Sequence, residues 1–79
     1  MTDLNLYAME VWEAHVAKSH VTTLASAMEW ALIRHWSKTT PLRVVLQAIR
    51  DTAKAPRTLL YYEKPVEEAY VHWQRSLSL

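Results

Sequence analysis

The chain of 79 residues contains no glycine and no cysteine. Gly-rich phosphate loops, tight hairpins and nucleophile elbows each need a positive φ or a close backbone approach, so the lack of glycine argues against them. Without cysteine there is no disulfide framework and no thiolate metal site. The absence of glycine also favours helices joined by loops that need no left-handed residue. We therefore predict an all-α fold.

Long apolar runs are also missing. No run approaches the roughly 18 residues of a membrane span. The N-terminal stretch is acidic and lacks the basic start of a signal peptide. We expect a cytoplasmic protein with no membrane partner. The length allows one small domain, 1–79, whose core is marginal without self-association or a larger partner.

The helix predicted over residues 41–54 is the element around which the others are expected to pack. Thr40 before Pro41 is typical of a helix start, with a hydroxyl N-cap and proline at the first helical position. Apolar residues then recur at spacings of three and four, which indicates one buried face. This face consists of Leu42, Val45, Leu46, Ile49 and Ala53.

Three further helices complete a predicted bundle of about four. The first begins after Asp3 or Thr2 and fades near Lys18. The second begins at a capping box, in which the Ser26 hydroxyl and the Glu29 carboxylate each accept the other's backbone amide. That helix runs through Trp36 and ends over the next three residues.

The last helix is predicted to start at Pro65, with acidic residues in its first turn. Residues 57–62 before it are expected to form an irregular or one-turn connection. Its apolar side chains must be covered by the rest of the chain.

Catalytic and metal-binding patterns are weak. His72 lies four residues after Glu68 on one predicted helix, and this is the only notable spacing of a histidine with an acidic residue. No HExxH or ExxH arrangement exists. Serine and threonine are plentiful, but none sits on a recognisable strained turn beside a histidine. We expect no enzymatic activity, no metal and no cofactor.

Basic residues are concentrated in the middle of the chain. Residues 34–64 carry seven basic and two acidic side chains, a net charge of +5, while both flanking regions are acidic. Such asymmetry can mark a surface that contacts phosphates without reading sequence. It can equally hold the acidic flanks, or a neighbouring copy, against the middle. The predicted phosphate contacts are Lys38, Arg43, Arg50, Lys54 and Arg57.

Tyr61 and Tyr62 stand beside Arg57 and Lys64. Aromatic rings interleaved with basic residues can stack on the bases of single strands. Most other Trp and Tyr residues lie on apolar helix faces and replace the missing phenylalanine in the core. We expect at least one of the two tyrosines to be exposed and include both in the predicted nucleic-acid site.

The order of these features resembles a known family. A helix starts with Ser-x-x-Glu and ends in Trp, a second helix has an apolar core, a tyrosine segment follows, and a last helix closes on Trp. In this order, residues 24–75 resemble the C-terminal domain of DnaD-like bacterial and phage replication proteins. The matching residues are Ser26, Glu29, Trp36, Val44, Val45, Ala48, Ile49, Tyr61 or Tyr62, and Trp73.

Some positions depart from the family pattern. Pro65 and Ala69 stand where the family has a tyrosine and an isoleucine, and the usual glycine after the Trp36 helix is missing. The resemblance implies a small helical module that contacts DNA or replication proteins. We therefore expect a non-enzymatic module that binds nucleic acid, DNA in preference to RNA. The alternative is a small structural subunit in a homo-oligomer or a larger nucleoprotein assembly.

Overall fold

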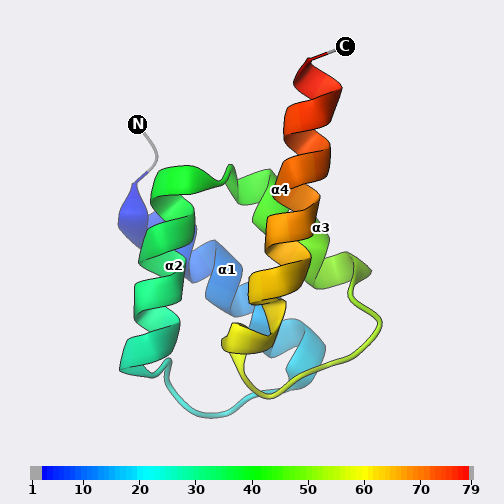
Figure 1. Ribbon diagram of the computed structural model, residues 1–79. Helices are drawn as coiled ribbons and strands as arrows, with labels where there is room; N and C mark the ends of the chain where they lie inside the picture. Colours follow the sequence, from blue (N-terminus) through cyan, green and yellow to red (C-terminus); the bar gives the residue numbers. More distant parts are fainter. Residues whose placement is uncertain (1–2, 79) are drawn as a thin grey trace.

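The computed structural model describes residues 3–78 and consists of helices joined by short connections (Figure 1). No strand occurs among these residues, so the predicted all-α fold is confirmed. The elements are α1 (Leu4–Ser19), α2 (Ala27–Thr39), α3 (Leu42–Asp51), the single 3-10 turn η1 (Leu59–Tyr62) and α4 (Glu63–Leu77).

Local capping sets the ends of α1 and the start of α2. The Asp3 carboxylate accepts the Asn5 amide at 2.9 Å, which confirms Asp3 as the N-cap of α1. His20 ends that helix in the left-handed region, with φ of 54°, a position that glycine usually occupies. The capping box of Ser26 and Glu29 is present at the start of α2.

The start of α3 differs from the prediction. The helix begins at Leu42, and Pro41 rather than Thr40 occupies the N-cap position without a side-chain cap. Thr40 is buried, and its carbonyl oxygen accepts a hydrogen bond from the Tyr7 hydroxyl at 2.8 Å. Its hydroxyl is paired with Thr39 instead of capping α3. A contact with α1 therefore fixes the turn between α2 and α3.

The end of α3 also differs, because the helix stops at Asp51 rather than near Lys54. The ammonium group of Lys18, on α1, donates to the carbonyl oxygens of Ile49 at 2.5 Å, of Arg50 at 3.3 Å and of Thr52. A lysine at a helix C-terminus satisfies carbonyls that have no partner within the helix. This long-range cap ends α3 three residues before the predicted boundary.

The last helix begins two residues earlier than predicted. Glu63 follows η1 without a break, and Pro65 is the third residue of α4. Proline is tolerated there because the first backbone N–H groups of a helix have no intrahelical acceptor. The one-turn connection predicted over residues 57–62 is confirmed as η1, and its side chains Leu59 and Tyr62 are buried.

One hydrophobic core joins all the elements. Helix α3 packs against α1 and α4 and touches α2, so its predicted central place is confirmed. Val45 and Ile49 of the predicted α3 face are buried, and Val44 and Ala48 widen this face, whereas Ala53 lies beyond the end of the helix and is exposed. The core cluster consists of Tyr7, Ala8, Val11, Ile33, Trp36, Val45, Ala48, Ile49, Leu59, Tyr62 and Val66.

The C-terminal half of α4 projects beyond the other helices (Figure 1). Val66 at its start is buried, whereas Leu77 near its end is 63 % exposed. The projection contributes to an elongated outline of 42 × 29 × 18 Å. Within residues 3–78, no helix combines the length and the apolar composition that crossing a membrane requires.

Candidate nucleic-acid interface

The five basic residues predicted to contact phosphates are all exposed and lie on different elements of the fold. Each of five surface cavities within residues 3–78 is lined by at most one of them. Lys38 precedes α3 and Arg57 follows it, and the ten residues of α3 span roughly 15 Å. By position, Lys38 lies on α2, Arg43 and Arg50 on α3, and Lys54 and Arg57 in the connection to η1.

Arg50 lies in the same cleft as acidic side chains of α1. It lines a cleft of about 620 Å³ between α1 and α3, together with Glu10, Glu13 and Lys18. Two carboxylates balance the charges of Arg50 and Lys18 in this cleft, which weakens the attraction of Arg50 for a phosphate. Arg50 is therefore a weaker candidate for phosphate contact than Arg57, whose cavity has no carboxylate.

The connection between α3 and α4, residues 52–62, presents the remaining candidates together. Lys54 and Arg57 are exposed, and Tyr61 is 44 % exposed. Tyr62 is fully buried, so its inclusion in the contact surface is wrong for this conformation. The two rings meet nearly at right angles, 89°, with centroids 6.1 Å apart, so Tyr61 rests on a buried ring.

Glu29 holds the backbone of this connection against α2. One of its carboxylate oxygens accepts the Ser26 amide at 3.0 Å, and the other accepts the Leu59 amide at 2.9 Å. Burial raises the pKa of Glu29, but the hydrogen bonds from Leu59 and Ser26 outweigh burial and lower the pKa overall. The buried carboxylate is therefore ionised, and it binds the amide of a residue that lies 30 positions later in the sequence.

His15 holds the same connection against α1. Its Nε2 lies 3.3 Å from the carbonyl oxygen of Arg57, and because a carbonyl only accepts, Nε2 carries the hydrogen. Burial lowers the pKa of His15, and the Arg57 carbonyl and the Glu29 carboxylate oppose this only in part. The ring is fully buried and packs edge-on against Trp12 and Tyr62, with centroids 5.2 and 5.8 Å away.

Three contacts thus fix the connection at its backbone. Lys18 binds the carbonyl of Thr52, His15 binds that of Arg57, and the Glu29 carboxylate binds the amide of Leu59. The backbone is held while the side chains of Lys54, Arg57 and Tyr61 stay outside.

Sequence patterns did not reveal these contacts. The sequence predicts the local capping box of Glu29 but not its second contact, and His15 lies on the buried face of α1. Their partners lie 30 and 42 residues further along the chain. The only available signal was a histidine on an otherwise apolar stripe, which must find a polar partner when buried.

His15 and Glu29 hold the backbone of this region in place. His15 is enclosed by aromatic rings, and Glu29 is occupied by two amide donors, so neither side chain is presented to a substrate. Among the side chains of residues 3–78, no group of three or more His, Asp or Glu converges as metal ligands would.

Comparisons with protein-family models, with curated proteins and with solved structures find no match to this chain.

Proposed function

We propose that the chain is a non-enzymatic nucleic-acid-binding module that contacts phosphate backbones through residues 52–62. The observation that carries the proposal is a connection with exposed Lys54, Arg57 and Tyr61 on a backbone anchored at three points. The resemblance to DnaD-like replication domains favours DNA over RNA and a role in replication.

Anchoring matters because binding must otherwise supply the free energy that orders a loop. A connection that is already fixed loses little conformational entropy when a strand arrives. Lys54 and Arg57 then contribute electrostatic attraction that does not depend on base sequence. Tyr61 offers a ring for a base, worth about 1–3 kcal/mol by analogy with single-strand binders.

The other basic residues take a secondary place in this proposal. Lys64, in the first turn of α4, is exposed next to the connection and extends its positive charge. Lys38 and Arg43 lie toward the opposite end of α3, where a bound strand reaches them only by following the helix. Arg50 contributes least, since Glu10 and Glu13 share its cleft.

The test compares two double variants with the same change in net charge. Lys54→Gln with Arg57→Gln removes the two central contacts, and Arg34→Gln with Arg75→Gln removes two exposed charges on α2 and α4. Binding of oligonucleotides is measured by fluorescence anisotropy as a function of salt. For the first variant, the slope of log K against log salt becomes shallower by about 1.4 for single strands and about 1.8 for duplexes.

The control pair should keep the slope of the unmodified protein. If the slope became equally shallow in both double variants, net charge and not the connection would drive binding. No measurable binding of either single or double strands at low salt would exclude the function itself.

A second candidate function is a protein-packing subunit. A groove of about 450 Å³ between α2 and α4 is lined by Leu32, Trp36, Val66 and Tyr70 among others, and several large apolar side chains elsewhere are exposed. Apolar and aromatic surface of this kind is typical of protein partners. Absent nucleic-acid binding, combined with concentration-dependent sedimentation, would favour this role over the first.

A further inference from the structure

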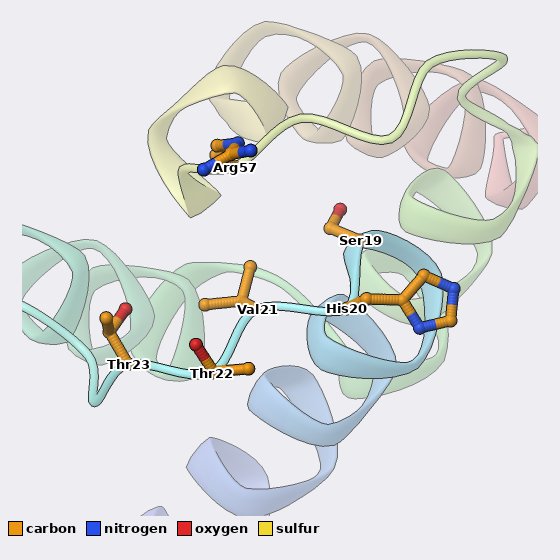
Figure 2. A pocket seen from close by; sticks show the side chains of 6 residues that line it. All are labelled: Ser19, His20, Val21, Thr22, Thr23 and Arg57. Atoms are coloured by element: carbon orange, nitrogen blue, oxygen red, sulfur yellow. The ribbon is translucent and has the colours of Figure 1, made fainter.

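A polar pocket lies where residues 52–62 pass the connection between α1 and α2 (Figure 2). Its volume is about 440 Å³. Arg57 forms one wall, and the other is formed by Ser19, His20, Val21, Thr22 and Thr23. We call it the Arg57 pocket. We propose that the Arg57 pocket binds a phosphate group, with the guanidinium as its cation and threonine hydroxyls as hydrogen-bond donors.

The donor set suits an anion. A guanidinium offers several N–H groups in a fixed geometry, and each hydroxyl can donate one more hydrogen bond. No carboxylate lines the pocket, in contrast to the cleft around Arg50. Figure 2 shows the hydroxyls of Ser19 and Thr22 pointing to the side on which Arg57 lies, whereas the ring of His20 points away. The proposal therefore leaves His20 out.

Ser19 also lines the pocket, but its hydroxyl is not one of the proposed donors. Its Oγ is buried and has no hydrogen-bond partner, although it lies close enough to the Tyr62 hydroxyl to oppose the rise that burial causes in the pKa of Tyr62. Buried hydroxyls are normally paired. The buried Ser19 and Tyr62 hydroxyls therefore face each other, and the proposal rests on Arg57, Thr22 and Thr23.

Both walls of the pocket are held in place before a ligand arrives. His15 binds the carbonyl of Arg57, and the amide of His20 binds the carbonyl of Val16 at 2.7 Å. The C-terminus of α1 at this wall carries roughly half a negative charge. The full positive charge of Arg57 exceeds it, so the pocket keeps a net attraction for anions.

The size of the pocket indicates more than an isolated phosphate. Small-molecule sites span roughly 300–1,000 Å³, and this cavity falls within that range. The methyl groups of Val21, Thr22 and Thr23 can contact a sugar attached to the phosphate. The phosphate could belong to a strand or to a free monoester. A strand as its source rests on the proposed function, whereas the chemistry of the pocket does not.

The experiment is an NMR titration of the full chain labelled with 15N. Inorganic phosphate and an oligothymidylate are added separately, and the backbone amides of residues 19–23 and the side-chain N–H of Arg57 are followed. We expect both ligands to shift these signals. Thr22→Val with Thr23→Val, which removes two exposed donors while keeping their shape, should raise the Kd for both by about tenfold.

Arg57→Gln removes the proposed cation and should also weaken binding of both ligands. Arg34→Gln is its matched control and should not, because both residues are exposed and each change removes one positive charge. Retained signal dispersion in each variant shows that it folds. The inference fails if phosphate shifts signals elsewhere, or if the valine variant binds both ligands as the unmodified chain does. If the valine variant binds both ligands unchanged, oligonucleotide binding would still support the proposed function. Phosphate binding in the pocket without oligonucleotide binding would instead support a monoester site and contradict the proposed function.

Discussion

At the scale of single residues, two buried tyrosines differ in what their hydroxyl groups contact. Tyr7 is 1 % and Tyr62 0 % exposed. The Tyr7 hydroxyl donates to the carbonyl of Thr40 at 2.8 Å, whereas that of Tyr62 has no hydrogen-bond partner. Burial raises the pKa of both phenols, so both are protonated donors at neutral pH. The pair separates the value of a hydrogen bond from that of a buried ring.

We predict that Tyr7→Phe lowers the free energy of unfolding by about 1–2 kcal/mol, because it removes one hydrogen bond and leaves the Thr40 carbonyl buried without a partner. Tyr62→Phe keeps the ring and removes only an unpaired hydroxyl. It should leave stability unchanged or raise it. Urea denaturation of both variants measures the difference. Equal losses would mean that the Tyr62 hydroxyl is paired in solution.

At the scale of elements, local signals predicted the helices but not all their ends. The capping box of α2 and the Asp3 cap of α1 involve neighbours in sequence, and both were predicted. The ends of α3 depend on Tyr7 and Lys18, more than 30 residues away. Caps supplied across the fold leave no periodic pattern in the sequence, so both α3 boundaries were placed wrongly.

The candidate surface was predicted in part for the same reason. Exposure of Arg57 and Tyr61 follows from a polar and aromatic segment without helical periodicity, and exposure of Lys54 from its place outside the apolar face of the predicted helix. That Tyr62 points inward depends on His15, whose ring packs against it. The anchoring of residues 52–62 depends on Glu29, whose capping role concealed its second contact.

The clamp on this connection can be tested by Glu29→Gln. The glutamine keeps one acceptor oxygen but turns an NH₂ group toward the second amide, so either Ser26 or Leu59 loses its acceptor. We expect the free energy of unfolding to fall by about 2–3 kcal/mol, since hydrogen bonds to a charged group are lost in a buried place. Thermal or urea unfolding provides the measurement. Glu68→Gln on the exposed face of α4 is the control and should change stability little.

At the scale of the whole molecule, two buried ionisable groups tie stability to pH. Burial lowers the pKa of His15 from its ordinary 6.5, so its contribution is complete above pH 6.5 and is lost as the pH falls below that value. The hydrogen bonds from Leu59 and Ser26 outweigh burial and lower the pKa of Glu29 from 4.5. Its contribution is lost below about pH 4.5. Both effects act in the same direction, toward unfolding in acid.

The two groups can be separated because they titrate in different intervals. His15→Phe keeps an aromatic ring between Trp12 and Tyr62 and removes the titrating nitrogen, although it also leaves the Arg57 carbonyl without its donor. We therefore expect this variant to be less stable at pH 7, yet to show almost no change in unfolding free energy between pH 7 and pH 5. The unmodified chain should lose stability there, at up to about 1.4 kcal/mol per pH unit. Urea unfolding at half-unit steps of pH measures both curves.

His72→Phe, at an exposed site on α4, should keep the profile of the unmodified chain. A His15→Phe variant that loses stability as steeply as the unmodified chain would assign the acid sensitivity to another group.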